Sequence, residues 1–310
     1  MKIAITGQQD FGKAVLEAFL ARGDQVAGVF CAPEKPGGRP DALKVAAQEK
    51  GVKVFQFTSL KSDEAKKALH ELDVELGVMA FVLQFAPQDF VNIPKRGTIQ
   101  YHPSLLPKYR GPSSINWPIA RGDAQTGLTI FRPTDGLDEG PVILQKTTPI
   151  GPDDTLGTVY FERLFPMGVQ AMLEAADLVV AGKHRETTQD ESQATYEGWF
   201  RKAEARIHWA SHVDHVYNVI RGSNPAPGAW TTLEGKELQI FDARKIPVRT
   251  FSAVRGKIGE IVEVSGNAFQ VTAQGGRIEV LRAKLGDGKK VAAGELVASD
   301  SIRAGQLLGT

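Results

Sequence analysis

The sequence predicts an α/β fold in which a doubly wound, mostly parallel sheet is followed by a small C-terminal β-barrel. The first half alternates short apolar runs with longer runs of helical periodicity, as repeated βαβ units require. After a polar stretch at residues 183–193, short alternating runs are separated by glycine-rich turns, which is typical of small barrels. The 310 residues, 42% of them hydrophobic, also exceed the size at which one core usually keeps growing, so we expect two domains.

The predicted elements follow from these periodicities in chain order. The first domain, residues 1–203, contains apolar runs read as strands at residues 2–6, 25–31, 53–57, 76–81, 98–102, 126–131 and 142–147. The helices between and after them are predicted at residues 11–21, 42–49, 63–72 and 155–180, which makes a Rossmann-like arrangement. The second domain, residues 204–310, is predicted as an OB-like barrel with a helix at 211–221 that Ser211 caps, and strands at 237–241, 259–264, 269–272 and 277–281.

Residues 7–12, GQQDFG, carry two of the three glycines of a dinucleotide-binding fingerprint. The central glycine, which lets the backbone approach a pyrophosphate, is replaced by Gln9. An NAD-dependent oxidoreductase is therefore a weak alternative.

Composition restricts the partners and the compartment. The net charge is +1, although residues 201–310 hold 16 Lys and Arg against 11 Asp and Glu. We interpret this surplus of positive charge as a solvated surface, in preference to a binding site for phosphates or a polyglutamate tail. The single cysteine, Cys31, excludes an internal disulfide and suits a reducing compartment. The chain opens directly on a strand and has no long uncharged apolar stretch, so we expect a cytoplasmic protein without a leader or a membrane partner.

Three histidines, His208, His212 and His215, have the spacing of one helix face. Because Ser211 is the expected N-cap, His208 would precede the helix, and no matching acidic ligand is evident apart from Asp214. We expect structural histidines and no metal.

Residues 100–111 read QYHPSLLPKYRG, and residues 134–140 read TDGLDEG. His102 ends a predicted strand, at the edge of an α/β sheet where ligands bind. The acidic loop lies between two further predicted strands, which would bring it to the same edge. A histidine and a carboxylate placed there can stabilise a tetrahedral oxyanion and transfer its protons.

Two motifs resemble the signature of the folate-dependent formyltransferase family: HPSLLP followed by RG, and GLDxG further along the chain. The resemblance covers essentially the whole chain. It implies transfer of the formyl group of 10-formyltetrahydrofolate, without a metal, by a catalytic domain at residues 1–203. It also implies that His102 polarises the formyl oxygen, that Asp138 orients a water and relays the proton, and that Ser104 helps to hold the site. Gln100 stands where family transferases usually have Asn as a second oxyanion donor, and its extra methylene displaces the amide enough to cost about a hundredfold in rate.

The resemblance also implies a pterin cleft between two loops. Its residues would be Val82, Leu83, Gln84, Phe85 and Ala86 on one side, and Thr134, Asp135, Gly136 and Leu137 with Asp138 on the other. Core packing remains an equal alternative for Leu83 and Phe85. Arg110, before Gly111, would grip a carboxylate or phosphate of folate or acceptor, or else lie solvated in its loop.

The acceptor is left open among water, a small amine or sugar, and initiator tRNA. Segments such as residues 115–117 and 194–198 resemble most closely the hydrolase module of 10-formyltetrahydrofolate dehydrogenase, which is our first choice. Methionyl-tRNA formyltransferases come second, because residues 32–41 lack the basic cluster of their long loop and phosphate contacts dominate RNA affinity. The non-enzymatic alternative is a nucleic-acid-binding barrel on an inactive scaffold.

Overall fold

The chain forms two compact units that interleave along the sequence. The computed structural model describes residues 1–248, 250 and 255–309. The first unit comprises Met1–Gly111, Gly127–Thr148 and Arg163–Tyr196, and the second comprises Pro112–Thr126, Pro149–Glu162 and the residues from Glu197 onward. The division after residue 203 expected from the sequence stays a prediction.

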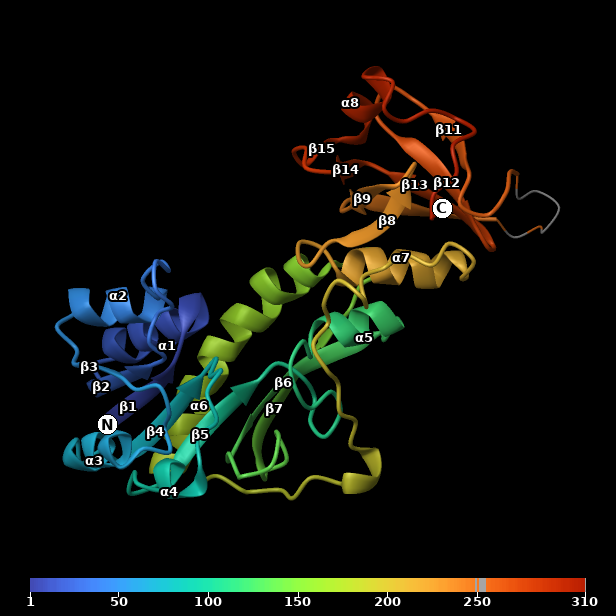
Figure 1. The fold of residues 1–310 in the computed structure, drawn as a ribbon. Helices are drawn as coiled ribbons and strands as arrows, with labels where there is room; N and C mark the ends of the chain where they lie inside the picture. The colour runs from blue at the N-terminus through green and yellow to red at the C-terminus, as the bar shows by residue number, and fades with distance from the viewer. Residues whose placement is uncertain (249, 251–254, 310) are drawn as a thin grey trace. The chain divides into compact units, whose positions relative to one another are not determined.

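A mostly parallel sheet forms the centre of the first unit, as predicted (Figure 1). Its order is β3-β2-β1-β4-β5-β6-β7. The strands are β1 (Lys2–Gly7), β2 (Gln25–Cys31), β3 (Val54–Gln56), β4 (Leu76–Ala80), β5 (Thr98–His102), β6 (Gln125–Phe131) and β7 (Val142–Pro149). The pairs among β1 to β5 are parallel, whereas β6 runs antiparallel to β5.

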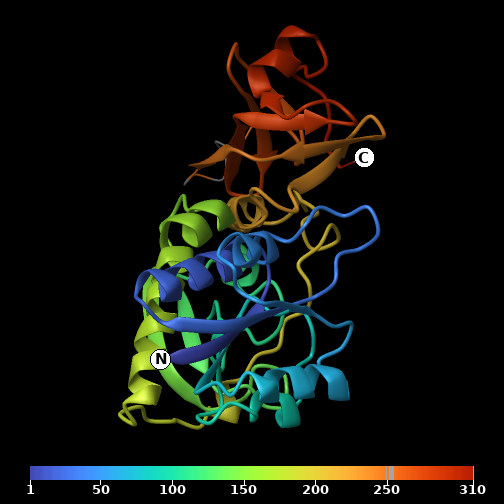
Figure 2. The same ribbon diagram turned by 90° about the vertical axis from the view of Figure 1, so that its left-hand side faces the viewer.

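Helices cover both faces of this sheet because successive strand residues point to opposite sides. Ile3 and Ile5 of β1 pack in one core with α1 (Gln9–Ala21), α2 (Ala42–Glu49) and α6 (Phe165–Val180). Ala4 packs on the opposite face with α3 (Asp63–Glu71) and α4 (Gln88–Val91). In Figure 2 the blue helices α1 and α2 and the cyan helices α3 and α4 lie on opposite sides of the strands. The sheet is therefore doubly wound.

The start of α1 is closed to a dinucleotide phosphate. The Asp41 carboxylate accepts hydrogen bonds from the Gln9 N–H at 2.9 and 3.0 Å, where a phosphate would need that donor. A Cβ on Gly7 would lie 2.1 Å from the Ala80 carbonyl oxygen, so this glycine serves the close approach of β1 and β4. Both contacts oppose the NAD-dependent alternative.

One helix changes type along its length, and the N-cap of another differs from the expected residue. The helix predicted at 155–180 is helical from Leu156 to Val180, but its residues Thr158–Leu164 are π-helical and α6 begins at Phe165. Pro166 has no N–H to donate within the regular hydrogen-bond ladder, which explains a change of helix type here. The N-cap of α7 (Val213–Gly222) is His212 and not Ser211, because the His212 Nδ1 accepts from the Asp214 N–H at 3.3 Å.

The second unit contains two separate antiparallel sheets, with orders β10-β13-β12-β11 and β15-β14-β9-β8. The strands are β8 (Ala229–Leu233), β9 (Lys236–Ile240), β10 (Ala243–Pro247), β11 (Ile261–Val264), β12 (Phe269–Ala273), β13 (Gly276–Val280), β14 (Arg282–Leu285) and β15 (Val291–Ala292). The helices are α5 (Asn116–Arg121), α7 and α8 (Ala293–Ala298). Both sheets contribute to one core, for example through Ile240 and Phe269, while closure into a single barrel stays a prediction. Of the described helices, none combines the length and the apolar character that crossing a membrane requires.

Cys31 provides a test of how tightly the first unit is packed. Its side chain is buried, and burial, together with the charges of Asp41 and Glu34, raises the pKa of the thiol to about 11. We expect the folded protein to react with Ellman's reagent at pH 8 at least about a hundredfold more slowly than the urea-unfolded chain, since only the thiolate attacks. Equal rates in the two states, measured by absorbance, would contradict this packing.

Candidate active site

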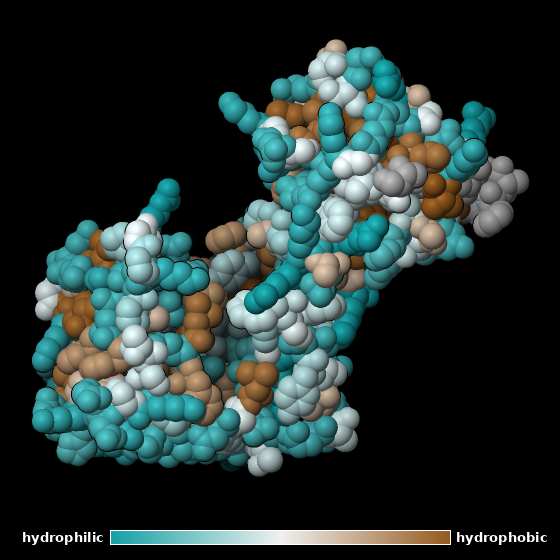
Figure 3. Space-filling view, in the orientation of Figure 1, coloured by the Kyte–Doolittle hydropathy of each residue, from teal (hydrophilic) through white to brown (hydrophobic). Residues whose placement is uncertain are grey.

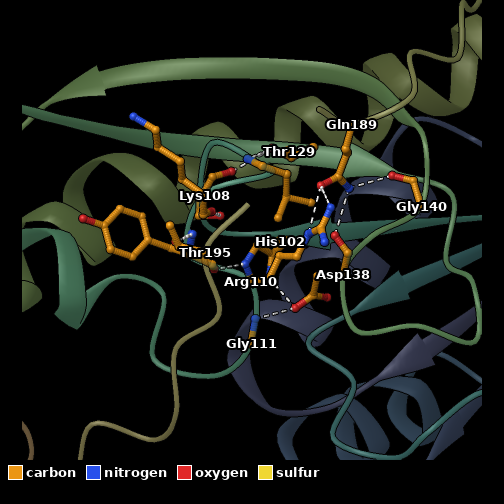
Figure 4. Close-up of polar contacts among 12 residues, drawn as sticks. His102, Lys108, Arg110, Gly111, Thr129, Asp138, Gly140, Gln189 and Thr195 are labelled. Atoms are coloured by element: carbon orange, nitrogen blue, oxygen red, sulfur yellow. Dashed lines mark hydrogen bonds and ion pairs between the residues drawn. The ribbon is translucent and has the colours of Figure 1, made fainter. Parts of the chain in front are cut away.

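His102 is the last residue of β5 and is held in one orientation. Its side chain is 6% exposed, and its Nε2 lies 2.8 Å from the Tyr109 carbonyl oxygen. Because a carbonyl only accepts, Nε2 must carry the proton that it donates. The second ring nitrogen, Nδ1, lies 3.6 Å from the Asp138 Oδ2. The two side chains that the sequence singled out thus face each other (Figure 4).

Asp138 reaches His102 by a route that differs from the expected one. The sequence interpretation brought the acidic loop to the end of β5 from a neighbouring strand end. Instead β6 is antiparallel to β5, and its last residue, Phe131, pairs with Gln100. The loop must therefore travel back along β5, and the Gly111 N–H, 2.8 Å from the Asp138 Oδ2, fixes the carboxylate there.

The two residues that contact the histidine ring both have a left-handed backbone conformation. Tyr109, which supplies the carbonyl for Nε2, has φ of 59°, and Asp138 has φ of 53°. Such left-handed conformations cost a non-glycine residue up to about 1–3 kcal/mol, and they persist only where surrounding contacts impose them. Strain at both contact residues is typical of a functional site.

Arg110 is neither a solvated residue nor a free grip for an anion, which corrects both expectations. Its side chain is fully buried. All five guanidinium N–H groups have acceptors: Nε and Nη2 donate to Gln189, Nη1 and Nη2 to Glu191, and Nη1 to the Tyr196 hydroxyl. The hydrogen bonds that Arg110 donates to Glu191 raise the pKa of Arg110 and lower the pKa of Glu191. With no donor left for a ligand, Arg110 anchors its loop.

Gln189 joins the two catalytic loops, and sequence reasoning missed it. Its Oε1 accepts from Arg110, while its Nε2 donates to the carbonyl oxygens of Asp138 at 2.9 Å and Gly140 at 2.7 Å (Figure 4). The residue is 6% exposed, although it lies in the polar stretch at residues 183–193. Further along, Thr195 accepts from the Arg110 N–H through its carbonyl and from the Tyr109 N–H through its hydroxyl. The segment that contains Gln189 and Thr195 therefore stabilises the loops that carry Tyr109 and Asp138.

Ser104 and Gln100 take different places around the histidine. Ser104 is fully buried and its hydroxyl donates to the Lys108 carbonyl at 2.7 Å, so it holds the turn that carries Tyr109. Thr129 of β6 donates to the Ser104 carbonyl and accepts from the Leu106 N–H. Gln100 lies two residues before His102 in β5, so both side chains project from the same face of the strand.

The loop after β4 presents apolar side chains to the surface. Leu83 is 54% and Phe85 is 49% exposed, so core packing is the wrong interpretation for both. Val82 is partly buried, Ala86 is buried, and Gln84 donates to the Phe57 carbonyl at 2.8 Å. Hydrophobic patches of this kind appear in brown on the visible face in Figure 3.

The acidic loop, expected as the opposite side of the cleft, also exposes an apolar residue. Leu137 is 53% exposed, like the apolar residues after β4. Gln88, at the start of α4, donates its N–H to the Asp135 Oδ1 and its amide to the Pro133 carbonyl, both at 3.0 Å. One residue thus connects the two loops. Thr134 lines a different cavity of about 350 Å³ with Thr98 and Arg132, and Gly136 follows Asp135 in the turn.

Metal ligation finds no support in the geometry. Within the described part of the chain, no group of three or more His, Cys, Asp or Glu side chains is arranged to hold a metal ion. His212 instead caps α7 and contacts Asp214 at 3.3 Å.

Comparison with known proteins identifies the class to which this fold belongs. The profile described as formyl transferase matches residues 1–176, and that of the formyl transferase C-terminal domain matches residues 200–301. Together the two profiles cover most of the chain and define a transferase. The chain belongs to the formyl transferase family.

Three similar proteins illustrate the range of the family. Mitochondrial 10-formyltetrahydrofolate dehydrogenase of Mus musculus is 41% identical over 78% of this chain and 26% of its own length, so this chain spans about a quarter of that relative. Methionyl-tRNA formyltransferase of Geotalea uraniireducens (strain Rf4) is 31% identical over 100% of this chain and 98% of its own. The structure of HypX from Aquifex aeolicus in complex with tetrahydrofolic acid superposes with a TM-score of 0.68 at 18% identity, covering 96% of this chain and 47% of that one, and shows the same fold.

The substitution Gln189→Ala tests whether the hydrogen bonds of Gln189 stabilise the site. It would leave two buried carbonyls and two Arg110 N–H groups without partners, and each unsatisfied group costs about 1–3 kcal/mol. We expect a lower unfolding free energy in urea and, because the Asp138 loop loosens, a fall in kcat of one to two orders of magnitude. Gln193→Ala, a neighbouring exposed glutamine whose amide contacts only Asp190, is the control and should change stability by less than about 0.5 kcal/mol. Equal effects of the two substitutions would contradict the role of Gln189.

Proposed function

We propose that this chain removes the formyl group from 10-formyltetrahydrofolate and, as first choice, passes it to water, releasing formate and tetrahydrofolate. The contact of His102 with Asp138 carries the catalytic part of the proposal. The family membership supports the formyl donor, and relatives named 10-formyltetrahydrofolate dehydrogenase reach 41% identity.

The hydrogen bond to Tyr109 determines how His102 acts. With Nε2 committed to that carbonyl, only Nδ1 is left to meet the formyl oxygen, and it donates only when the ring is an imidazolium. The Asp138 carboxylate at 3.6 Å stabilises that cation. His102 then stabilises the oxyanion that forms when water adds to the formyl carbon. Asp138 takes the proton of the attacking water and delivers it to the folate nitrogen as the carbon–nitrogen bond breaks.

Gln100 is proposed as the second donor to the oxyanion. It shares a strand face with His102, and its amide has no hydrogen-bond partner recorded among the described residues. Ser104 and Gly111 are proposed to maintain the loop, and the apolar residues 82–86 and 134–137 to form the pterin cleft. The two antiparallel sheets around one core support the proposal of an OB-like barrel at residues 204–310.

Formylation of initiator methionyl-tRNA is the second candidate function. One observation favours it: the chain covers 98% of a methionyl-tRNA formyltransferase at 31% identity, whereas it covers only part of the dehydrogenases. Against it stands the loop at residues 32–41, where Lys35 and Arg39 are offset by Glu34 and Asp41. Glu34 moreover binds Lys44 at 3.0 Å. The loop therefore offers little positive charge to a phosphate backbone.

Substitution of the two central residues tests the chemistry. We expect His102→Ala and Asp138→Asn each to lower kcat by about 10²–10⁴ with folate binding, followed by fluorescence quenching, largely retained. The matched control is His70→Ala, an exposed histidine at the end of α3. Unchanged turnover of the His102 variant would refute the assignment.

The acceptor is decided by following tetrahydrofolate release from 10-formyltetrahydrofolate, alone and with initiator methionyl-tRNA. The hydrolase proposal expects turnover in both reactions, because water is always present. Turnover only with the charged tRNA would reverse the order of the two candidates. Gln100→Ala should lower kcat by about 10²–10³ at unchanged KM if the amide donates to the oxyanion.

A further inference from the structure

The second unit contains a cavity of about 430 Å³ that the proposed reaction does not use. All its lining residues belong to this unit: Asp153, Thr155, Tyr217, Ile220, Arg221, Asn224, and Phe241, Asp242, Ala243, Arg244, Lys245 and Leu281. A volume of this size accommodates a small molecule. The lining contains both apolar and charged side chains.

Arg221, in the last turn of α7, is the unusual member of this lining. Its side chain is 6% exposed. Nε donates to the Asn218 Oδ1 at 2.8 Å, and Nη1 donates to the carbonyl oxygens of Gly151 at 3.3 Å and Asp154 at 3.1 Å. Nη2 has no hydrogen-bond partner within the described residues, nor does a described carboxylate oxygen form an ion pair with this guanidinium. A buried positive charge is thus held by neutral acceptors alone.

The two acidic residues of the cavity lining form hydrogen bonds with other groups and not with Arg221. Asp153 accepts from the Tyr217 hydroxyl at 2.9 Å, and Asp242 accepts from Asn224 at 2.9 Å. Burial, together with the bond to Asp153, raises the pKa of Tyr217 to about 12, so this donor persists at neutral pH. Asp242 also lies 3.6 Å from the Arg282 Nε.

The two other basic residues of the lining contact carboxylates of the same unit. Lys245 is bound to Asp214, and Arg244 has only a 3.8 Å contact with Glu279. Burial lowers the pKa of Arg221, although nearby Tyr217, Asp154 and Asp153 act in the opposite direction. Because no described carboxylate accepts a hydrogen bond from this guanidinium, an anion that enters the cavity gains a charge-assisted contact there.

We propose that this cavity binds a small molecule through an oxyanion, either a carboxylate or a phosphate, which accepts from the free Nη2 of Arg221. The apolar part of the molecule lies against Ile220, Phe241 and Leu281, which line the same cavity. The site is separate from His102 and Asp138, and it stands whichever formyl acceptor is correct.

The test measures binding of inorganic phosphate and of acetate to the full chain by calorimetry and by the rise in Tm, with chloride added to keep the ionic strength constant. The wild type should show saturable binding of at least one of the two anions, and the one that binds identifies the chemistry. Arg221→Gln should weaken that binding at least about tenfold. Arg303→Gln, an exposed arginine outside the cavity, is the control and should bind like the wild type.

A second variant keeps the test decisive if Arg221→Gln does not fold. Ala243→Glu places a carboxylate in the cavity lining while Arg221 remains, so it should fold and lose the response to both anions. The proposal is overturned if the wild type binds neither anion saturably, or if Ala243→Glu binds as tightly as the wild type.

Discussion

The hydrogen bond from the His102 Nε2 to the Tyr109 carbonyl is the constraint on which the active site depends. It assigns one ring nitrogen to structure and leaves the other to face Asp138. Tyr109 presents this carbonyl in a left-handed backbone conformation, which is sterically unfavourable for a non-glycine residue. Contacts from outside the loop must therefore impose the conformation.

Those contacts come from a segment late in the first unit. Thr195 binds the backbone of Tyr109 and Arg110, and Gln189 joins the Arg110 guanidinium to the Asp138 loop. A buried arginine is normally expensive, yet here each N–H has an acceptor, so the network rigidifies the site. The His102–Asp138 contact thus depends on residues that lie far from both of them in the sequence.

Arg110 and Arg221 show what burial of the same side chain can indicate. Both are at most 6% exposed. The side chains of Gln189, Glu191 and Tyr196 accept from all the donors of Arg110, and the hydrogen bonds to Glu191 raise its pKa. Burial instead lowers the pKa of Arg221. The arginine whose donors are all satisfied holds its loop, whereas the one with an unsatisfied donor lines the cavity for which we propose a ligand.

Local patterns in the sequence were enough to determine the doubly wound sheet, most strand positions and the pairing of His102 with Asp138, because periodicity and a short motif depend on neighbouring residues. Local patterns did not reveal the roles of Gln189 and Thr195 or the full set of hydrogen bonds made by Arg110. These hydrogen bonds join residues far apart in the sequence, since Arg110 and Gln189 are 79 positions apart. The reversal of β6 and the His212 cap were also missed. Such features arise only when distant segments pack, and a buried polar group then takes whichever partner the fold supplies.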